Sequence, residues 1–244
     1  MKISLITTVF NNVHEIEETL LSVFSQNYKN LEYIVIDGGS TDGTFEILKK
    51  YSNNISILVS EKDQGLYYAL QKGFGRSSGD IVGLLHSGDI FSGDGILKKI
   101  EHRFQENNPD ILYGDLIYVQ KENTSQVART WKSGTPKRLS LGWTPPHPTL
   151  FMKKRINEEI GPFDTQFKIS ADYDFMLRAF KNKTFKIDYL PEVLVKMRTN
   201  GKSNNTLKTF FEKTMEDWKI IRKNNVGHIH TLALKKLTKL PQFL

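Results

Sequence analysis

The first 110 residues alternate short apolar runs with amphipathic segments, and this alternation most restricts the folds open to the chain. Strands are predicted at 2–10, 32–37, 55–61 and 80–86, and apolar residues at helical spacing lie between them at 13–26, 43–51 and 66–74. Strands separated by helices of this length are typical of a parallel, doubly wound sheet. We therefore expect an α/β fold with a mostly parallel sheet flanked by helices.

After about residue 110 the pattern changes. Short strands are predicted at 111–120 and 127–131, a proline-rich loop at 143–148 and an amphipathic helix at 173–180. The sequence shows no internal repeat and no low-complexity linker, so we expect the second half to extend the same sheet. The predicted organisation is a domain at 1–204, with a ligand-binding half at about 1–110 and a second half at about 111–204, followed by a basic helical tail at 205–244.

The composition excludes some kinds of site and location. The chain has no cysteine, which excludes disulfides, thiolate metal sites and a cysteine nucleophile. The first apolar run meets Asn11 and Asn12 without a small-residue cleavage site, so it predicts a strand and not a signal peptide. No apolar stretch approaches the roughly 18 residues that a membrane-spanning helix needs. We expect a cytoplasmic protein, with peripheral contact at the inner face of the membrane as an open alternative.

Positive charge is concentrated at the C-terminal end. Residues 201–244 hold nine Lys or Arg and three acidic residues, so they carry +6 of the net charge of +7. Such a segment suits an anionic lipid surface, although a solvated helix face is the simpler interpretation, and we expect no nucleic-acid binding. Of the two apolar stretches in this region, 210–221 is expected to pack on the protein and 232–243 to suit a membrane interface.

Acidic residues stand at the ends of three predicted strands. Asp37 ends the second strand, Asp63 follows the third and Asp89 follows the fourth. Ligands of open parallel sheets bind outside the carboxyl ends of the strands. An aspartate after an apolar strand costs stability unless a polar partner meets it, and a ligand or metal supplies one. The alternative is that Asp37 and Asp42 serve only as turn and cap residues.

Four motifs in one order point to a known family. The segments ITTVFNN, VIDGGSTDG, EKDQGLYYALQKG and GDIVGLLHSGD together resemble the inverting glycosyltransferases of family 2 that act in bacterial cell-surface polysaccharide biosynthesis. The resemblance covers about residues 2–203. It implies the GT-A fold, which is Rossmann-like, and the transfer of a sugar from a nucleotide-sugar donor, with a UDP-sugar as the expected donor.

The resemblance also implies site residues. The implied nucleotide-sugar-binding positions, with Asp37 contacting the base, are Thr7, Val9, Asn11, Asp37, Gly39, Asp63, Gly65 and Ser87. Asp89 stands where the family's metal-binding acid ends its strand, which implies Mg²⁺ or Mn²⁺ on the diphosphate.

The metal motif departs from the family pattern. Many members carry D-x-D or S-D-D, whereas this chain reads His86-Ser87-Gly88-Asp89 with one carboxylate. One carboxylate, phosphates and waters still satisfy an octahedral cation, so binding is expected to depend on the nucleotide. His86 either joins the metal or packs at the strand end.

The second half supplies the expected base. Asp172 and Asp174 open a predicted helix, where two acids also suit simple charge–dipole capping. The resemblance places the catalytic acid in this element, so Asp172 is the predicted general base and Asp174 a supporting or acceptor-binding acid. Ala171 stands where many relatives have a glutamate.

Other residues are assigned to the acceptor or the diphosphate. By resemblance, His147 lies near the acceptor, and Arg198 and Lys202 are the expected phosphate partners. The alternative is that His147 is a surface residue and that the two cations are solvated loop charges. The Q-x-x-R-W signature of processive synthases is absent from the sequence, which favours the addition of one sugar.

The predicted function is metal-dependent, hexosyltransferase-type transfer to a glycan or lipid-linked acceptor. A non-catalytic nucleotide-sugar or glycan-binding protein is the alternative. In either case we expect residues 37, 63, 89 and 172 to meet at one cleft.

Overall fold

A single mixed sheet organises the chain. The computed structural model describes residues 1–199 and 207–238. The sheet has nine strands, in the order β3-β2-β1-β4-β8-β6-β9-β5, with β7 beside β6. The strands are β1 (Ile3–Val9), β2 (Leu31–Asp37), β3 (Ile57–Ser60), β4 (Ile81–Leu84), β5 (Ile90–Phe91), β6 (Ile111–Gln120), β7 (Asn123–Trp131), β8 (Phe151–Lys153) and β9 (Ile187–Arg198).

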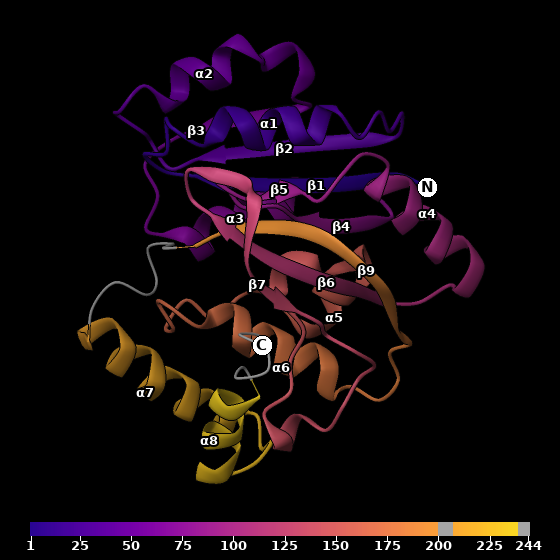
Figure 1. Ribbon diagram of the computed structural model, residues 1–244, viewed down its shortest axis with the longest axis vertical. Helices are drawn as coiled ribbons and strands as arrows, with labels where there is room; N and C mark the ends of the chain where they lie inside the picture. Colours follow the sequence, from indigo (N-terminus) through magenta and orange to yellow (C-terminus); the bar gives the residue numbers. More distant parts are fainter. Residues whose placement is uncertain (200–206, 239–244) are drawn as a thin grey trace.

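Helices cover both faces of this sheet (Figure 1). They are α1 (Ile16–Phe24), α2 (Thr44–Lys50), α3 (Leu66–Arg76), α4 (Ile96–Asn107), α5 (Lys154–Ile160), α6 (Ala171–Lys181), α7 (Leu207–Lys223) and α8 (Ile229–Leu237), with short 3-10 turns η1 (Ser52–Asn54), η2 (Leu139–Leu141) and η3 (His147–Thr149). One buried cluster includes side chains of α1, α2 and α4. A second includes side chains of α3, α5 and α6 with parts of α7 and α8, which lie beyond α6.

The first-half strands are parallel, as the alternation predicts. β1 pairs with β2 and β4, and β2 pairs with β3, in every case parallel. All seven residues of β1 are buried, which explains its continuous apolar character, because strands covered on both faces do not alternate. The carboxyl ends of these strands therefore lie at one edge, where Val9 stands beside Asp37 and Asp37 beside Ser60.

The second half continues the same sheet. The antiparallel strand β8 joins β4 to β6, and β9 runs parallel to β6 and antiparallel to β5. The predicted strand at 111–120 and helix at 173–180 are confirmed, and the strand predicted at 127–131 is longer, as β7. The GT-A-like expectation of a mostly parallel sheet flanked by helices is also confirmed.

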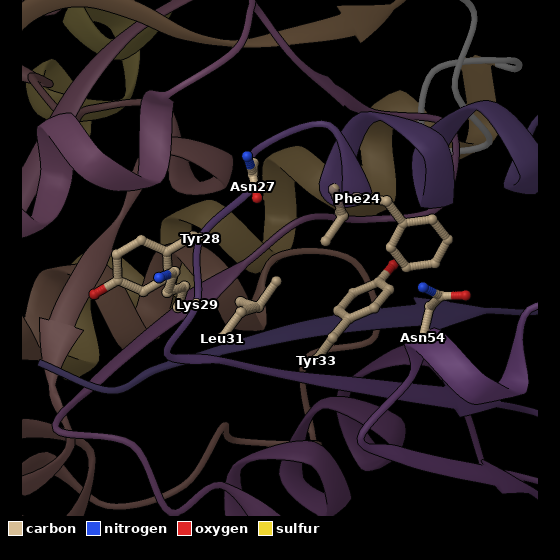
Figure 2. Close-up of a pocket in the computed structure, with 8 residues that line it drawn as sticks. Phe24, Asn27, Tyr28, Lys29, Leu31, Tyr33 and Asn54 are labelled. Carbon is tan, nitrogen blue, oxygen red and sulfur yellow. The ribbon is translucent and has the colours of Figure 1, made fainter.

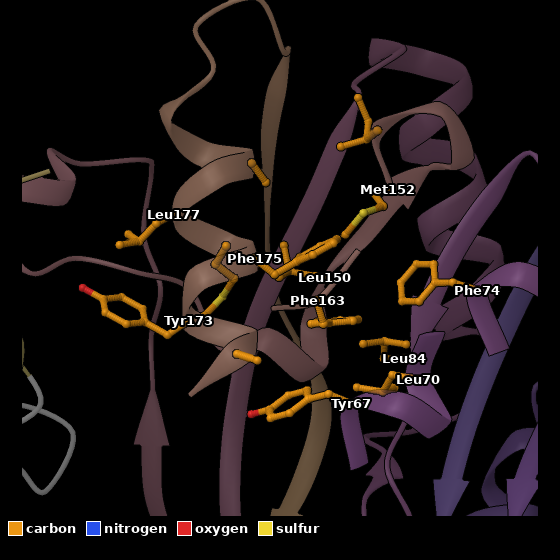
Figure 3. Close-up of a cluster of buried hydrophobic side chains, with 14 of the residues drawn as sticks. Tyr67, Leu70, Phe74, Leu84, Leu150, Met152, Phe163, Tyr173, Phe175 and Leu177 are labelled. Carbon is orange, nitrogen blue, oxygen red and sulfur yellow. The ribbon is translucent and has the colours of Figure 1, made fainter. Parts of the chain in front are cut away.

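An aromatic cluster fixes α3 against α6 (Figure 3). The rings of Phe163 and Phe175 stack with centroids 4.6 Å apart, and Phe163 also meets Tyr67 and Phe74 of α3 at 5.7 and 5.8 Å. These side chains are buried, and aromatic pairs contribute about 0.5–1.5 kcal/mol beyond their area burial. The cluster therefore places the first turn of α6 beside the first turn of α3.

The C-terminal helices differ from the expectation for the tail. In 210–221, the residues Phe210, Phe211 and Met215 are exposed, although this stretch was expected to pack on the protein; Asp217, Ile220 and Ile221 in its second half are buried. Leu232 of the second stretch is buried, so α8 packs on the body at this point. Helical spacing alone does not say which turns of α7 meet the core. The boundary at residue 204 stays a prediction.

Candidate functional site

A cleft of about 690 Å³ opens beyond the carboxyl end of β4. Its walls come from the loop 86–89, the first turns of α3 and α6, η3 and the β6–β7 hairpin. Residues of α7 and α8 complete it. Five residues with predicted roles line it together: Ser87, Asp89, His147, Asp172 and Arg198. The candidate metal ligand and the candidate base therefore face one space.

Asp172 is held in a hydrogen-bonding network at the start of α6. Its Oδ2 lies 3.1 Å from Nδ1 of His147, and its Oδ1 lies 3.2 Å from the hydroxyl of Tyr67. That hydroxyl donates a 2.7 Å hydrogen bond to the carbonyl of Ile169. The Asp172 side chain is 25% exposed, so it is accessible from the cleft.

The charges around Asp172 keep it ionised. Burial favours the protonated carboxyl, but His147 when protonated, Lys213 and Lys235 together hold the pKa of Asp172 below its ordinary value. A carboxylate that is ionised at neutral pH and open to the cleft can accept a proton. The geometry thus supports the base role that the sequence assigns to Asp172.

Asp89 has the environment of an unpaired acid. It is 7% exposed, and no described group hydrogen-bonds its carboxylate, although its backbone carbonyl accepts from Thr19 at 2.9 Å. Burial raises the pKa of Asp89 to about 8, while the charge of Arg198 opposes this. A hard divalent cation held jointly with phosphate oxygens suits such a carboxylate. Among the described residues no three His, Cys, Asp or Glu side chains form a metal cluster, although Glu15 also lines the cleft and its charge acts on Asp89.

Arg198 on β9 supports the loop 86–89, which carries the candidate metal ligand Asp89. Its guanidinium donates to the carbonyl of Gly88 and to the carboxylate of Glu18, and its Nε donates to the carbonyl of Lys121 at 3.3 Å. The side chain is buried. Arg198 thus fixes the backbone next to Asp89, and its expected phosphate contact stays a prediction. Lys202, the other expected phosphate partner, lies outside the described residues.

Ser87 and His86 complete the loop. The Asn12 amide donates to the Ser87 hydroxyl at 3.1 Å, which ties the loop to the end of β1. The His86 ring lies 5.4 Å from the ring of His147, and burial together with the His147 charge lowers the pKa of His86 to about 3. His86 is therefore neutral at physiological pH. Its ring faces His147 of η3 from the start of the loop 86–89.

Asp37 and Asp63 do not line this cleft. The Asp37 carboxylate is fully buried and accepts hydrogen bonds of 2.5 Å from the hydroxyls of both Ser40 and Ser60. Asp63 pairs with Lys72, and its Oδ2 is buried without a partner among the described residues. Of the four acids expected to line one cleft, only Asp89 and Asp172 do so. The carboxylates of Asp37 and Asp63 instead bind protein groups, namely two serine hydroxyls and Lys72.

The other residues predicted to bind the nucleoside lie on β1 or just after it, near the end of β2. The Thr7 hydroxyl donates to the carbonyl of Leu85 at 2.7 Å inside the core, and Val9 is buried. The Asn11 side chain accepts from the backbone of Thr41 at 2.9 Å, bridging the two strand ends.

Two glycines shape the same edge. Gly39 has φ +79°, and a Cβ there would lie 3.2 Å from the backbone of Lys62. Gly65 has φ +133° and precedes α3. A side chain at either position would meet backbone strain, because L residues rarely adopt these angles.

Asp174 has a structural environment. Its carboxylate is fully buried and is bonded by Arg178 at 2.9 Å, Lys223 at 3.0 Å and Asn224 at 2.9 Å. It joins α6 to α7 and does not line the cleft. Its predicted acceptor role has no support in this arrangement and stays a prediction.

The sequence analysis missed a group of cleft residues from the C-terminal region. Thr209, Lys213 and Asp217 of α7 and Lys235 of α8 all line the cleft. Lys213, Asp217 and Lys235 are ionisable residues between apolar positions, and that spacing alone looks the same as a solvated helix face. Tyr67 was also missed, although it follows Gly65 in the third motif.

A second hollow lies at the opposite, amino edge of the strands (Figure 2). Phe24, Tyr28 and Tyr33 are among its lining residues. None of the predicted site residues lines it. Within the described residues, no helix combines the length and apolar character required to cross a bilayer.

Comparison with known proteins points to one family. The model of Glycosyl transferase family 2 matches residues 4–168. An uncharacterized glycosyltransferase of Mycobacterium tuberculosis is 31% identical over 178 residues, which are 72% of this chain and 68% of the relative. A PGL/p-HBAD biosynthesis glycosyltransferase of Mycobacterium bovis is 26% identical over 84% of this chain and 79% of its own length.

Solved structures share the fold. Staphylococcus aureus TarS 1-349 in complex with UDP has a TM-score of 0.68 and 20% identity, with 95% of this chain and 68% of that chain covered. The match spans only 41% of the longer TarS chain. A mannosyltransferase from Pyrobaculum calidifontis in complex with GDP-Man and Mn²⁺ has a TM-score of 0.68 and 16% identity, with 99% and 72% covered. The family model covers more than half of the residues, and the chain therefore belongs to glycosyl transferase family 2.

Proposed function

We propose that this protein is an inverting glycosyltransferase that moves one sugar from a nucleotide-sugar donor to a glycan or lipid-linked acceptor. The observation that carries the proposal is the cleft in which the unpaired carboxylate of Asp89 and the ionised carboxylate of Asp172 both face the same space. Family membership supports the transfer activity.

Asp172 is the proposed general base. In a single displacement, the acceptor hydroxyl gives its proton to Asp172 while its oxygen bonds to the anomeric carbon. The bond from that carbon to the nucleoside diphosphate breaks on the opposite face, which inverts the configuration. His147 and Tyr67 hold the carboxylate in place at 3.1 and 3.2 Å, so little ordering is needed during the reaction.

Asp89 is the proposed ligand of Mg²⁺ or Mn²⁺. Such a cation, when bound, neutralises charge that grows on the departing diphosphate. The protein's part is to present one carboxylate on a loop that Arg198 and Asn12 hold in place. The structure of the mannosyltransferase neighbour is a complex with GDP-Man and Mn²⁺, which supports metal use in this fold.

The nucleotide is proposed to lie at the ends of β1 and β2. Asn11 and Gly39 lie at this edge of the sheet. A contact between the nucleobase and the Asp37 carboxylate would replace the hydrogen bond that the Ser40 hydroxyl donates to Asp37. TarS structures contain UDP and UDP-GlcNAc, which supports a UDP-sugar as donor. The name of the PGL/p-HBAD relative supports a role in cell-envelope glycan assembly.

Peripheral membrane contact is proposed through α7 rather than through the last stretch of the chain. Phe210, Phe211 and Met215 are exposed on it, and Lys236 lies 4.3 Å from the Phe210 ring. Exposed aromatic residues beside lysines suit an anionic interface. Co-sedimentation with phosphatidylglycerol vesicles tests this contact, which a Phe210→Ser, Phe211→Ser double variant should lose.

Release of nucleoside diphosphate from a panel of nucleotide sugars with Mn²⁺ tests the function. Asp172→Asn should lower the rate by about a hundredfold or more while UDP still raises the melting temperature, because only the base is lost. Asp89→Asn should lose both the activity and the metal-dependent rise in melting temperature that UDP causes. Asp94→Asn, an exposed acid, is the matched control.

The single acid in the metal loop favours a second candidate, a non-catalytic nucleotide-sugar-binding protein. UDP binding without turnover of any donor, unaffected by Asp172→Asn, would establish that function and refute the transferase.

A further inference from the structure

Three buried polar atoms without hydrogen-bond partners belong to residues that line the cleft. They are Oγ of Ser170, the hydroxyl of Tyr173 and Oδ1 of Asp217, and they make up three of the five such atoms in the described part of the chain. The three residues are only 2%, 3% and 6% exposed, and all three line the cleft. An unsatisfied buried polar group costs about 1–3 kcal/mol, so such a concentration indicates a missing partner.

A buried ion pair between Lys235 and Asp217 lies against the ring of Tyr173. Nζ of Lys235 lies 2.7 Å from Oδ2 of Asp217 and 3.3 Å from the centroid of the Tyr173 ring. Both members of the pair are buried. Lys235 therefore occupies one oxygen of Asp217, while the other oxygen accepts no hydrogen bond from the described residues.

These groups adjoin the proposed base. Ser170 is the N-cap residue of α6, and Tyr173 follows Asp172 in the first turn of this helix. The charges of Lys213 and Lys235 act on the pKa of Asp172, so the two lysines lie within electrostatic range of its carboxylate. A ligand that satisfies Tyr173 and Asp217 would thus lie in the same cleft as the base.

The wall of the cleft is fixed by α7 and α8. The Glu216 carboxylate accepts hydrogen bonds of 2.9 to 3.0 Å from the backbone amides of Lys168, Ile169 and Ser170, just before α6. On α8, the Thr231 hydroxyl donates to the carbonyl of Ser140 at 2.8 Å. The C-terminal helices therefore present Asp217 and Lys235 on a wall tied to the body of the protein.

We propose that Ser170, Tyr173, Asp217 and Lys235 form the subsite for the acceptor sugar. This inference rests on the proposed transferase function and names the residues that recognise its acceptor. Sugar hydroxyls both donate and accept, so one hydroxyl can donate to Oδ1 of Asp217 while another accepts from Tyr173. A phosphate suits the subsite less well, since it would face the carboxylate of Asp217 and has no proton to donate to it when fully ionised. The family model ends at residue 168, before all four residues.

The test separates the acceptor step from the donor step. Donor hydrolysis, with water as acceptor, is compared with diphosphate release stimulated by a panel of para-nitrophenyl hexosides and disaccharides. Tyr173→Phe should raise the KM for the stimulating glycoside by about tenfold, the loss of one hydrogen bond, and leave donor hydrolysis and donor KM unchanged. Its melting temperature should be unchanged or higher, because an unsatisfied hydroxyl is removed. Ser170→Ala should behave in the same way, and Tyr28→Phe, a phenol outside the cleft, is the control.

Several outcomes overturn the subsite. An unchanged glycoside KM in both variants would mean that water alone satisfies these atoms. Equal loss of hydrolysis and transfer would mean a purely structural role. A wild-type protein that binds UDP and hydrolyses the donor, but that no glycoside stimulates, would refute the subsite and leave the donor chemistry standing. Absence of UDP binding by the wild-type protein would refute the proposed function itself and the subsite with it.

Discussion

Replacing Glu32 by glutamine should destabilise the protein in a pH-dependent way. Glu32 is a buried acid on β2 that accepts hydrogen bonds from Nζ of Lys2 at 2.6 Å, from the Ser4 hydroxyl at 2.5 Å and from the amide and hydroxyl of Ser78 at 2.7 and 2.5 Å. Burial favours the protonated form, but these bonds and the Lys2 charge outweigh it and lower the pKa of Glu32 from 4.5 to about 2.

The magnitude follows from this shift. A folded-state pKa below the unfolded one stabilises the native state above the unfolded value, and the contribution is lost as the pH falls from about 4.5 towards 2. A difference of about 2.5 pH units corresponds to about 3 kcal/mol. At about pH 3 more than half of that contribution is gone.

Urea denaturation followed by circular dichroism gives the free energy of unfolding of wild type and Glu32→Gln. The variant should be less stable by about 3 kcal/mol near neutral pH, and this difference should shrink to about 1 kcal/mol near pH 3. Glu122→Gln, an exposed acid at the start of β7, should show neither effect. A difference between wild type and Glu32→Gln that stays constant with pH would refute the reasoning, since a lost packing contact has no such dependence.

Further predictions concern the cleft and its support. Phe163→Ala should lower the free energy of unfolding by about 3–5 kcal/mol in the same urea assay, because it removes the ring between α3 and α6; a loss below about 1 kcal/mol would contradict the packing described. Tyr67→Phe should lower kcat several-fold without changing donor KM, because it frees Asp172 and leaves the metal loop intact; an unchanged kcat would show that the hydroxyl does not position the base. Removal of divalent metal with EDTA should abolish the thermal shift caused by UDP, and Mn²⁺ should restore it; a shift that survives EDTA would exclude a cation held between Asp89 and the diphosphate.

The first half of the fold could be predicted from the sequence because its signals are local. An apolar run such as that of β1, buried on both faces, and the amphipathic segments after it specify a parallel sheet without further information. The positions of Asp37 and Asp89 at strand ends also follow from the pattern. Their different environments do not: Ser40 and Ser60 engage Asp37, whereas no described group hydrogen-bonds Asp89, and these contacts depend on neighbouring strands.

The second half was harder to predict because its order depends on distant contacts. The helix predicted at 173–180 was detectable from its amphipathic spacing and is found as α6, whereas the three-residue strand β8 has no pattern of its own. The charged residues of α7 and α8 looked like a solvated tail. Only the fold shows that Asp217 and Lys235 are a buried pair on the wall of the cleft.

The central claim is that the cation at Asp89 and the base at Asp172 share one cleft. The proton NMR signals of the His147 ring test it directly, because His147 contacts Asp172 and a paramagnetic ion broadens only nearby signals. Mn²⁺ with UDP should broaden the His147 signals in the wild-type protein and not in Asp89→Asn, while those of the exposed His102 on α4 stay sharp in both. Sharp His147 signals in a protein that has bound UDP and Mn²⁺, or broadening that persists in Asp89→Asn, would contradict the account.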